Sequence, residues 1–291
     1  MHGSENVEKD PSEMNASDFL VRKKASFLER IFKLENLLKV LSIMLLFVLW
    51  YLLVEFKIYR FGFIPHPVEV KEWFVKWVQQ PEFWIDMKHT FLRVWFGVIA
   101  AAVIAVPLGL LIGWKKVFRD LVFPVLEILR PIPGIAYIPM AILFLPGEEL
   151  PVAFIVFVGA FFPILVNTIN GVELIDNDYF RAAKCLGSSE FQIFKHVVVP
   201  GALPSISVGL ALGVGVGWMA SVAGEMISGK WGLGYRVWES YTLIRYPLIV
   251  VGMIVIGLLG YLSSGLLRYG ATRLIPWQKS YTQSLEEFIT E

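Results

Sequence analysis

The stretch YFRAAKCLGSSEFQIFKHVVVPGALP, residues 179–204, separates two long apolar segments of the chain. Its first half favours a short helix that ends at Gly187, because glycine tolerates the left-handed conformation found after many helices. Ser189 is suited to cap a second short helix. Pro200 and Pro204 then turn the chain, and Pro204 suits the first turn of the next long helix. A plain connection needs only a few polar residues, so this pattern indicates a loop with a function of its own.

The composition indicates a membrane protein. Of the 291 residues, 56% are hydrophobic and 18% are charged, and the mean hydropathy is +0.62. Soluble domains have about 45–50% apolar and about 25% charged residues. The net charge of +1 argues against a nucleic-acid partner, and the single cysteine, Cys185, excludes an internal disulfide framework. The charged start of the chain precedes an apolar run too long for a signal peptide, so we expect this run to remain as a helix.

Six segments have about 20 mostly apolar residues, the length that crosses a bilayer. They are Leu37–Phe56, Phe91–Trp114, Leu121–Leu145, Pro151–Val172, Ser205–Ile227 and Pro247–Leu267. The third segment is interrupted by two charged residues and three prolines, so we expect it to break and to lie among other helices rather than against lipid. The sequence therefore predicts an all-α membrane protein with about six transmembrane helices.

Lysine and arginine residues indicate the orientation. They gather in the N-terminal stretch, in the loops between spans two and three and between spans four and five, and in the tail. Since cytoplasmic loops carry an excess of these residues, we expect both termini to lie in the cytoplasm. Residues 68–80 predict a short external amphipathic helix. Residues 18–38 predict another, which either lies on an anionic leaflet or packs on the bundle.

The 179–204 stretch resembles the EAA loop of ABC-importer permeases, whose pattern is Glu-Ala-Ala, three residues, Gly, then a hydrophobic stretch ending in Leu-Pro. The matching residues are Ala182, Ala183, Leu186, Gly187, Phe194, Val197, Pro200, Leu203 and Pro204. Arg181 stands where the family usually has glutamate, so Ala182, Ala183 and Gly187 carry most of the docking prediction. In that family the loop docks in a groove of a separate ATPase subunit. The resemblance implies ATPase coupling by Arg181, Ala182, Ala183, Leu186, Gly187, Phe194, Pro200 and Pro204.

Further motifs look like those of the nitrate, sulfonate, taurine and bicarbonate permeases. They are IPHP at 64–67, HTFLRV at 89–94, PLG at 107–109, LRPIP at 129–133, GEM at 224–226 and GLGY at 232–235. This resemblance covers residues 63–277 and implies the type I ABC-importer (MetI-like) fold in a bacterial inner membrane. It also implies a second copy of the chain, an external solute-binding protein that delivers a small anion, and partner ATPase subunits that hold ATP and magnesium.

The sequence also suggests how the chain is divided. We expect a cytoplasmic extension at 1–36, a first transmembrane helix with an external segment at 37–88, a core transmembrane domain at 89–267 with the coupling loop at 176–204, and a cytoplasmic tail at 268–291. No ATP site is expected in this chain. The run from Gly224 to Lys230 nearly spells a phosphate-binding loop, but Trp231 stands where serine or threonine must hold magnesium.

Arg130 is a candidate for contact with the transported solute. It lies just before Pro131 and Pro133, where a broken helix lines a cavity rather than lipid, and a guanidinium matches planar anions. The alternative is a buried pair with Glu127, three residues away. Asn167 and Asn170 either hydrogen-bond another helix or line an anion pathway.

Glu225 is an ionisable residue near the end of the fifth span, with Trp218 and Ser221 on the same helix face. We expect a pairing or gating role, or else an interfacial glutamate that faces water. Arg93, near the outer end of the second span, has the same two alternatives as Arg130, contact with an anion or a structural role, and the structural role here is an extension of the side chain to the membrane interface (snorkelling). The expected pathway or gate residues are therefore Arg130, Pro131, Pro133, Asn167, Asn170, Trp218, Ser221 and Glu225. Gly209, Gly213 and Gly217 share one face and predict close helix packing.

Three other functions stay open at this point. A permease of the same family could carry a neutral vitamin or pyrimidine precursor. An ion-gradient secondary transporter usually shows an internal repeat, and none is clear in the sequence. An intramembrane enzyme would need a catalytic constellation at a common depth, and none is visible. The histidines are scattered, so we expect no metal site.

Overall fold

The computed structural model describes residues 34–56 and 64–275, and every regular element in these ranges is a helix. The chain divides into two compact units, Met1–Pro67 and Val68–Glu291, each described by itself. The amphipathic helix expected at 18–38 lies outside the described residues except for its end.

The first unit contains α2 (Leu34–Glu55), an apolar helix at the position of the first expected span. At its end, the ring of Tyr51 lies edge-on to that of His66 with 4.8 Å between centroids. The carboxylate of Glu55 lies 3.7 Å from Nε2 of the same histidine. A further helix, α3 (Pro67–Val78), follows as expected for residues 68–80 and buries Val70 and Trp77.

In the described part of the second unit, four helices are long and apolar enough to cross a membrane. They are α4 (Pro81–Trp114), α7 (Glu149–Glu173), α10 (Val199–Ser228) and α12 (Tyr246–Leu274). α4 begins well before the expected Phe91, because Pro81 suits a first helical turn and the polar residues Asp86, Thr90 and Arg93 lie on its buried face. Short helices join the long ones: α8 (Asn177–Cys185), α9 (Glu190–Ile193) and the π-helical turn η4 (Phe194–Val198) before α10, and α11 (Leu233–Thr242) before α12.

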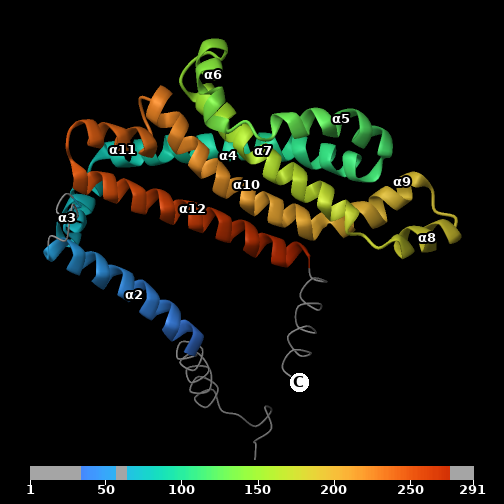
Figure 1. Ribbon diagram of the computed structural model, residues 1–291, viewed down its shortest axis with the longest axis horizontal. Coiled ribbons are helices and arrows are strands. Elements are labelled where there is room, and N and C mark those ends of the chain that lie inside the picture. Colours follow the sequence, from blue (N-terminus) through green and yellow to red (C-terminus); the bar gives the residue numbers. More distant parts are fainter. Residues whose placement is uncertain (1–33, 57–63, 276–291) are drawn as a thin grey trace, which may run out of the picture. The chain divides into compact units, whose positions relative to one another are not determined.

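α7 is the central helix of the second unit and packs along both α4 and α10, while α12 packs on α10 and α11 (Figure 1). The core between α4, α7 and α10 contains Val98, Ala101, Ile164, Leu165 and Val214, all nearly inaccessible to solvent. More than half of the most apolar window of α7 is buried inside the second unit. Because α7 is enclosed in this way, side chains on α4 and α10 are brought close to it along its whole length.

Glycines allow this close approach. A Cβ atom at Gly97 of α4 would lie 2.6 Å from the carbonyl oxygen of Ala153 on α7. One at Gly209 of α10 would lie 2.8 Å from Cβ of Asn167, and one at Gly213 would lie 2.8 Å from Cγ1 of Ile164. Small residues at helix crossings let two backbones come together inside a membrane. The same face of α10 continues to Gly217, which lies against both α4 and α7.

The third expected span is not one continuous helix. It consists of α5 (Lys116–Leu129) and an arm formed by the 3₁₀ turn η3 (Gly134–Tyr137) and α6 (Ile138–Phe144), with a bend of 86° between them. The break confirms the expected effect of Pro131 and Pro133, which lack a backbone N–H and disfavour helical conformation in the residue before them. The arm is held by a small cluster in which Ile138 and Ala141 pack against α7 and α10.

The glycine contacts predict that Gly209→Ala lowers stability. Its added methyl group meets Cβ of Asn167 and, at 3.3 Å, Cα of Ile164, so the backbones must move apart. Overpacking of this kind costs about 1–3 kcal/mol. We expect a lower melting temperature for the purified variant in detergent, while Gly257→Ala, whose Cβ meets nothing within 4 Å, melts like the parent. Equal melting of the two variants would contradict the packing account.

Candidate functional site

The loop between α7 and α10 has the local structure that its sequence predicts. The Asp176 side chain accepts a hydrogen bond from the backbone N of Asp178 at 2.9 Å and caps α8. Gly187 follows the helix with φ of +74°, and the N–H of Ser188 donates to the Ala183 carbonyl at 3.0 Å. Ser189 and Gln192 then form a capping box at the start of α9. The two short helices are therefore fixed by hydrogen bonds within the loop.

The loop presents apolar side chains to the outside. Leu186 is 85% exposed, Phe191 is 72% exposed and Tyr179 is 66% exposed. Ala182 and the charged Arg181 lie on the exposed surface too, and Arg181 pairs with Asp178 at 3.4 Å. An exposed apolar surface on a loop at the end of the bundle is typical of a docking site for another protein.

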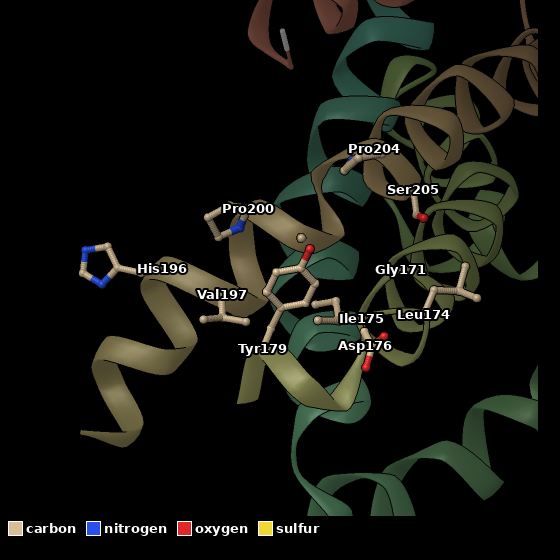
Figure 2. Close-up of a pocket in the computed structure, with 11 residues that line it drawn as sticks. Gly171, Leu174, Ile175, Asp176, Tyr179, His196, Val197, Pro200, Pro204 and Ser205 are labelled. Carbon is tan, nitrogen blue, oxygen red and sulfur yellow. The ribbon is translucent and has the colours of Figure 1, made fainter. Parts of the chain in front are cut away.

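Behind this surface is a hollow of about 760 Å³ (Figure 2). Figure 2 shows Tyr179 of α8 and Pro200 of α10 among its lining residues. The predicted coupling residue Pro204 also lines it, whereas Phe194 stacks on Trp114 at the end of α4, with ring centroids 4.9 Å apart. Pro200 and Pro204 thus contribute to the base of the loop rather than to its outer surface.

The start of α5 is tied to the same loop. Nζ of Lys115 lies 2.6 Å from a carboxylate oxygen of Glu190 and 3.9 Å from the centroid of the Trp114 ring. Arg119 forms an ion pair with Glu173 at the end of α7. The junction of α4 and α5 therefore contacts the end of α7 and the start of α9.

A second hollow, of about 410 Å³, lies where the broken span meets α7 and α10. Its lining includes Arg130, Pro133 and Asn167, three of the residues predicted to lie on a pathway. Arg130 is exposed, and no ion pair joins it to Glu127 in the part of the chain that the structure describes. The expected buried pair is therefore wrong, because no residue of α5 is buried in this chain and both side chains are exposed. Asn167 donates from Nδ2 to the carbonyl of Pro163 at 2.8 Å.

The other predicted pathway residues are placed elsewhere. Pro131 and Asn170 are not among the residues that line this hollow. Trp218 is 3% exposed and belongs to the core, where it lies against Gly260 of α12. Ser221 and Glu225 lie in a polar cluster at the end of α10.

Glu225 is completely buried. Its carboxylate accepts hydrogen bonds from Thr90 at 3.0 Å, Ser221 at 3.3 Å and the backbone N of Gly234 at 2.9 Å, and from Nη1 of Arg93 at 3.1 Å. The structure therefore favours the pairing alternative, and an interfacial glutamate that faces water is wrong. The reason is that the first turn of α11 directs the backbone N–H of Gly234 at the carboxylate.

Arg93 joins three helices. Its Nε and Nη2 donate to the two carboxylate oxygens of Glu149 at 2.6 and 2.8 Å. Nη1 donates to Glu225 and, at 2.6 Å, to the carbonyl of Trp231. Only 1% of the side chain is exposed. The alternative in which Arg93 extends to the membrane interface is therefore wrong. The guanidinium finds its partners on α7 and α10 and has no need to reach water.

Asp86 extends the cluster to α11. It is fully buried and accepts from the backbone N of Gly232 and from Nε of Arg236, both at 2.9 Å. Burial lowers the pKa of Arg236, but the hydrogen bond and the charge of Asp86 more than offset this effect, so the pKa is raised and the side chain stays charged.

Sequence reasoning missed Asp86, Thr90, Glu149 and Arg236 as members of this cluster. Asp86, Thr90 and Arg93 are spaced by four and three residues, which places them on one helix face. That spacing was the available signal. Glu149 and Arg236 carried no comparable signal, since their partners lie on other helices.

Residues 105–276 match the family model described as binding-protein-dependent transport system inner membrane component. The chain belongs to this family. An ABC transporter permease protein of Methanocaldococcus jannaschii is 40% identical to this chain. The matched region covers 64% of this chain and 70% of the relative. The nitrate import permease protein of Synechocystis is 32% identical over 73% of this chain and 81% of the relative. The taurine transport system permease protein of Escherichia coli is 28% identical over 81% of this chain and 88% of the relative.

These relatives confirm the resemblance seen in the sequence motifs. The permease has the all-α, MetI-like membrane fold that was expected, and it is a transport subunit of the ABC class. The family match also covers the second hollow and the whole 179–204 loop.

The buried cluster predicts that Arg93→Met destabilises the permease strongly. The variant leaves the carboxylate of Glu225 buried without its cation, and breaking such a pair costs about 3–5 kcal/mol. Arg130→Met is the control, because that arginine is exposed and its loss leaves no buried charge. Thermal melting in detergent compares the two, and equal melting temperatures would contradict the assigned role of the pair.

Proposed function

We propose that the permease is the membrane subunit of an ATP-driven importer for a small anion of the nitrate, sulfonate, taurine or bicarbonate class. The observation that carries this proposal is Arg130 in the 410 Å³ hollow. Its guanidinium has no carboxylate partner among the described residues, and an arginine fork suits a planar or tetrahedral oxyanion. The names of the nitrate and taurine relatives support the same substrate class.

The broken span makes the hollow suitable for a polar solute. Helices break inside a membrane only where the freed backbone groups lie within protein or face a water-filled cavity. Here Ile132, Pro133 and Gly134 of the break line the hollow together with Asn167 of α7. A transported anion would meet one cation and several neutral dipoles, which favours weak binding and release. Ser221 and Glu225 are proposed to hold the end of this pathway closed rather than to contact the solute.

ATP would be hydrolysed in separate subunits that dock on the 179–204 loop. Its exposed surface is formed by Tyr179, Leu186 and Phe191 together with Ala182 and Arg181. Gly187, with its left-handed conformation, sets the angle between α8 and α9. These subunits would hold ATP and magnesium, while a second copy of the permease completes the pathway and an external binding protein supplies the anion. In this arrangement the loop and both termini lie in the cytoplasm.

Replacement of Gly187 tests the docking loop. Gly187 and Gly147 have φ of +74° and +77°, and a Cβ atom at either position meets nothing within 4 Å. Valine therefore imposes the same local strain at both positions, about 1–2 kcal/mol, but only Gly187 lies in the loop. We expect tagged Gly187→Val to copurify several-fold less ATPase than the parent, and Gly147→Val to copurify as much. Equal capture by both variants would refute the docking role.

Replacement of Arg130 tests the substrate class. The assay is ATP-dependent uptake into proteoliposomes with the binding protein, using nitrate, bicarbonate, taurine, ethanesulfonate and a neutral pyrimidine as separate probes. We expect uptake of at least one anion and a KM raised about tenfold in Arg130→Gln, since a charge-assisted hydrogen bond is lost. Arg130→Lys should be intermediate. Uptake of the neutral probe alone, or an unchanged KM in Arg130→Gln, would overturn the anion assignment.

A further inference from the structure

The two carboxylates that bind Arg93 differ in how easily they can leave. Glu225 is fully buried and is also held by Thr90, Ser221 and the backbone of Gly234. The Glu149 side chain is 52% exposed. Its other contact is with Nδ1 of His89 at 2.8 Å, on a ring that is 34% exposed.

Release of Glu149 leaves the buried charges paired, although Nε and Nη2 of Arg93 lose their acceptors. Arg93 keeps its contacts with the carboxylate of Glu225 and the carbonyl of Trp231, so one buried cation still faces one buried anion. The freed carboxylate of Glu149 gains water at its exposed position. Opening of the Arg93–Glu225 contact, in contrast, would strand both charges away from water. The Arg93–Glu149 contact is therefore the one that can open and close.

Glu149 lies at the joint between α6 and α7. It is the first residue of α7 and directly follows the turn 145–148, in which Gly147 has φ of +77°. On the other side of this turn is α6, the arm of the broken span. The break at the far end of this arm lines the hollow that contains Arg130. A contact that fixes Glu149 to α4 thus fixes one end of the arm, while Ile138 and Ala141 fix its face.

We propose that Arg93 and Glu149 are positioning residues for permeation. In the closed pair, the fork of Arg93 holds the α6–α7 turn against α4. When the pair opens, the α6 arm is free to move and the pathway opens at the end opposite the 179–204 loop (Figure 1). The part of this proposal in which ATP drives the opening rests on the proposed function. The part in which the pair positions the α6–α7 turn is independent of it.

The neighbouring residue supplies a matched control. Glu148 forms an ion pair with Lys230 at 2.5 Å, and the Lys230 side chain is 74% exposed. The hydrogen bond to Glu148 raises the pKa of Lys230, so this lysine stays charged. Glu148→Gln and Glu149→Gln therefore each remove one carboxylate charge from the same turn. Only the second breaks a contact with a buried arginine.

The first measurement is hydrogen–deuterium exchange of the peptide 138–150 in the purified permease without nucleotide. We expect Glu149→Gln to raise its exchange at least about threefold, and Glu148→Gln to leave it at the parent value. Arg93→Lys, which keeps the charge but loses the fork, should lie between them. Parent-like exchange in Glu149→Gln, or an equal rise in Glu148→Gln, would overturn the positioning role. Glu149→Asp is the second variant, and the proposal requires it to exchange less than Glu149→Gln.

The second measurement compares the nucleotide-free complex with one trapped by ATP and vanadate. In the parent we expect exchange of peptide 138–150 to rise on trapping. In Glu149→Gln it should already be high and should not change, while the ATPase rate of the copurified complex stays within about twofold of the parent. A merely structural defect would lower that rate. Absence of any rise in the parent would overturn the opening step. Failure to copurify an ATPase would instead refute the proposed function, and the nucleotide-free comparison would still decide the positioning role.

Discussion

The close packing of α7 between α4 and α10 is the constraint on which the rest of the structure depends. Glycines at the crossings, such as Gly97 and Gly209, remove the side chains that would hold the helices apart. Because the backbones approach so closely, Arg93 of α4 reaches carboxylates on both α7 and α10. The same packing leaves the hollow beside Asn167, where the broken span meets α7 and α10. Larger residues at the crossings would separate the members of both sites.

The two sites differ in how an arginine charge is balanced: Arg93 is paired inside the protein and Arg130 is not. Arg93 is buried and has two carboxylate partners and one carbonyl, as a charge out of water requires. Arg130 is exposed in a hollow and has no carboxylate partner in the described residues. A cation left without an internal partner is available to a ligand. This contrast, rather than the presence of an arginine in a span, is the reason why Arg130 is the residue proposed to meet an anion.

The loop and the hollow are also connected through the chain. α5 begins at the junction where Lys115 contacts Glu190 and Trp114 stacks on Phe194, and it ends at the break that contains Arg130. α5 is therefore the single helix between the loop contact and the hollow, and none of its residues is buried in this chain. Gly134, the first residue of the η3–α6 arm, also lines the hollow, and the arm leads on to Glu149 and the buried cluster. The broken span thus links the two ends of the bundle.

Short-range features of this protein were determined by the sequence alone. Gly187, Ser189 and the prolines at 131 and 133 act on the backbone within a few residues, so the helix ends and the break they predict are found in the structure. Hydropathy located the long helices, but not the start of α4, because its polar residues are satisfied by other helices. The tertiary structure alone decided which charges meet. Glu225 lies 132 residues from Arg93 in the chain, whereas Glu127, three residues from Arg130, does not pair with it. Ion pairs depend on which helix faces pack together, and no local pattern specifies that.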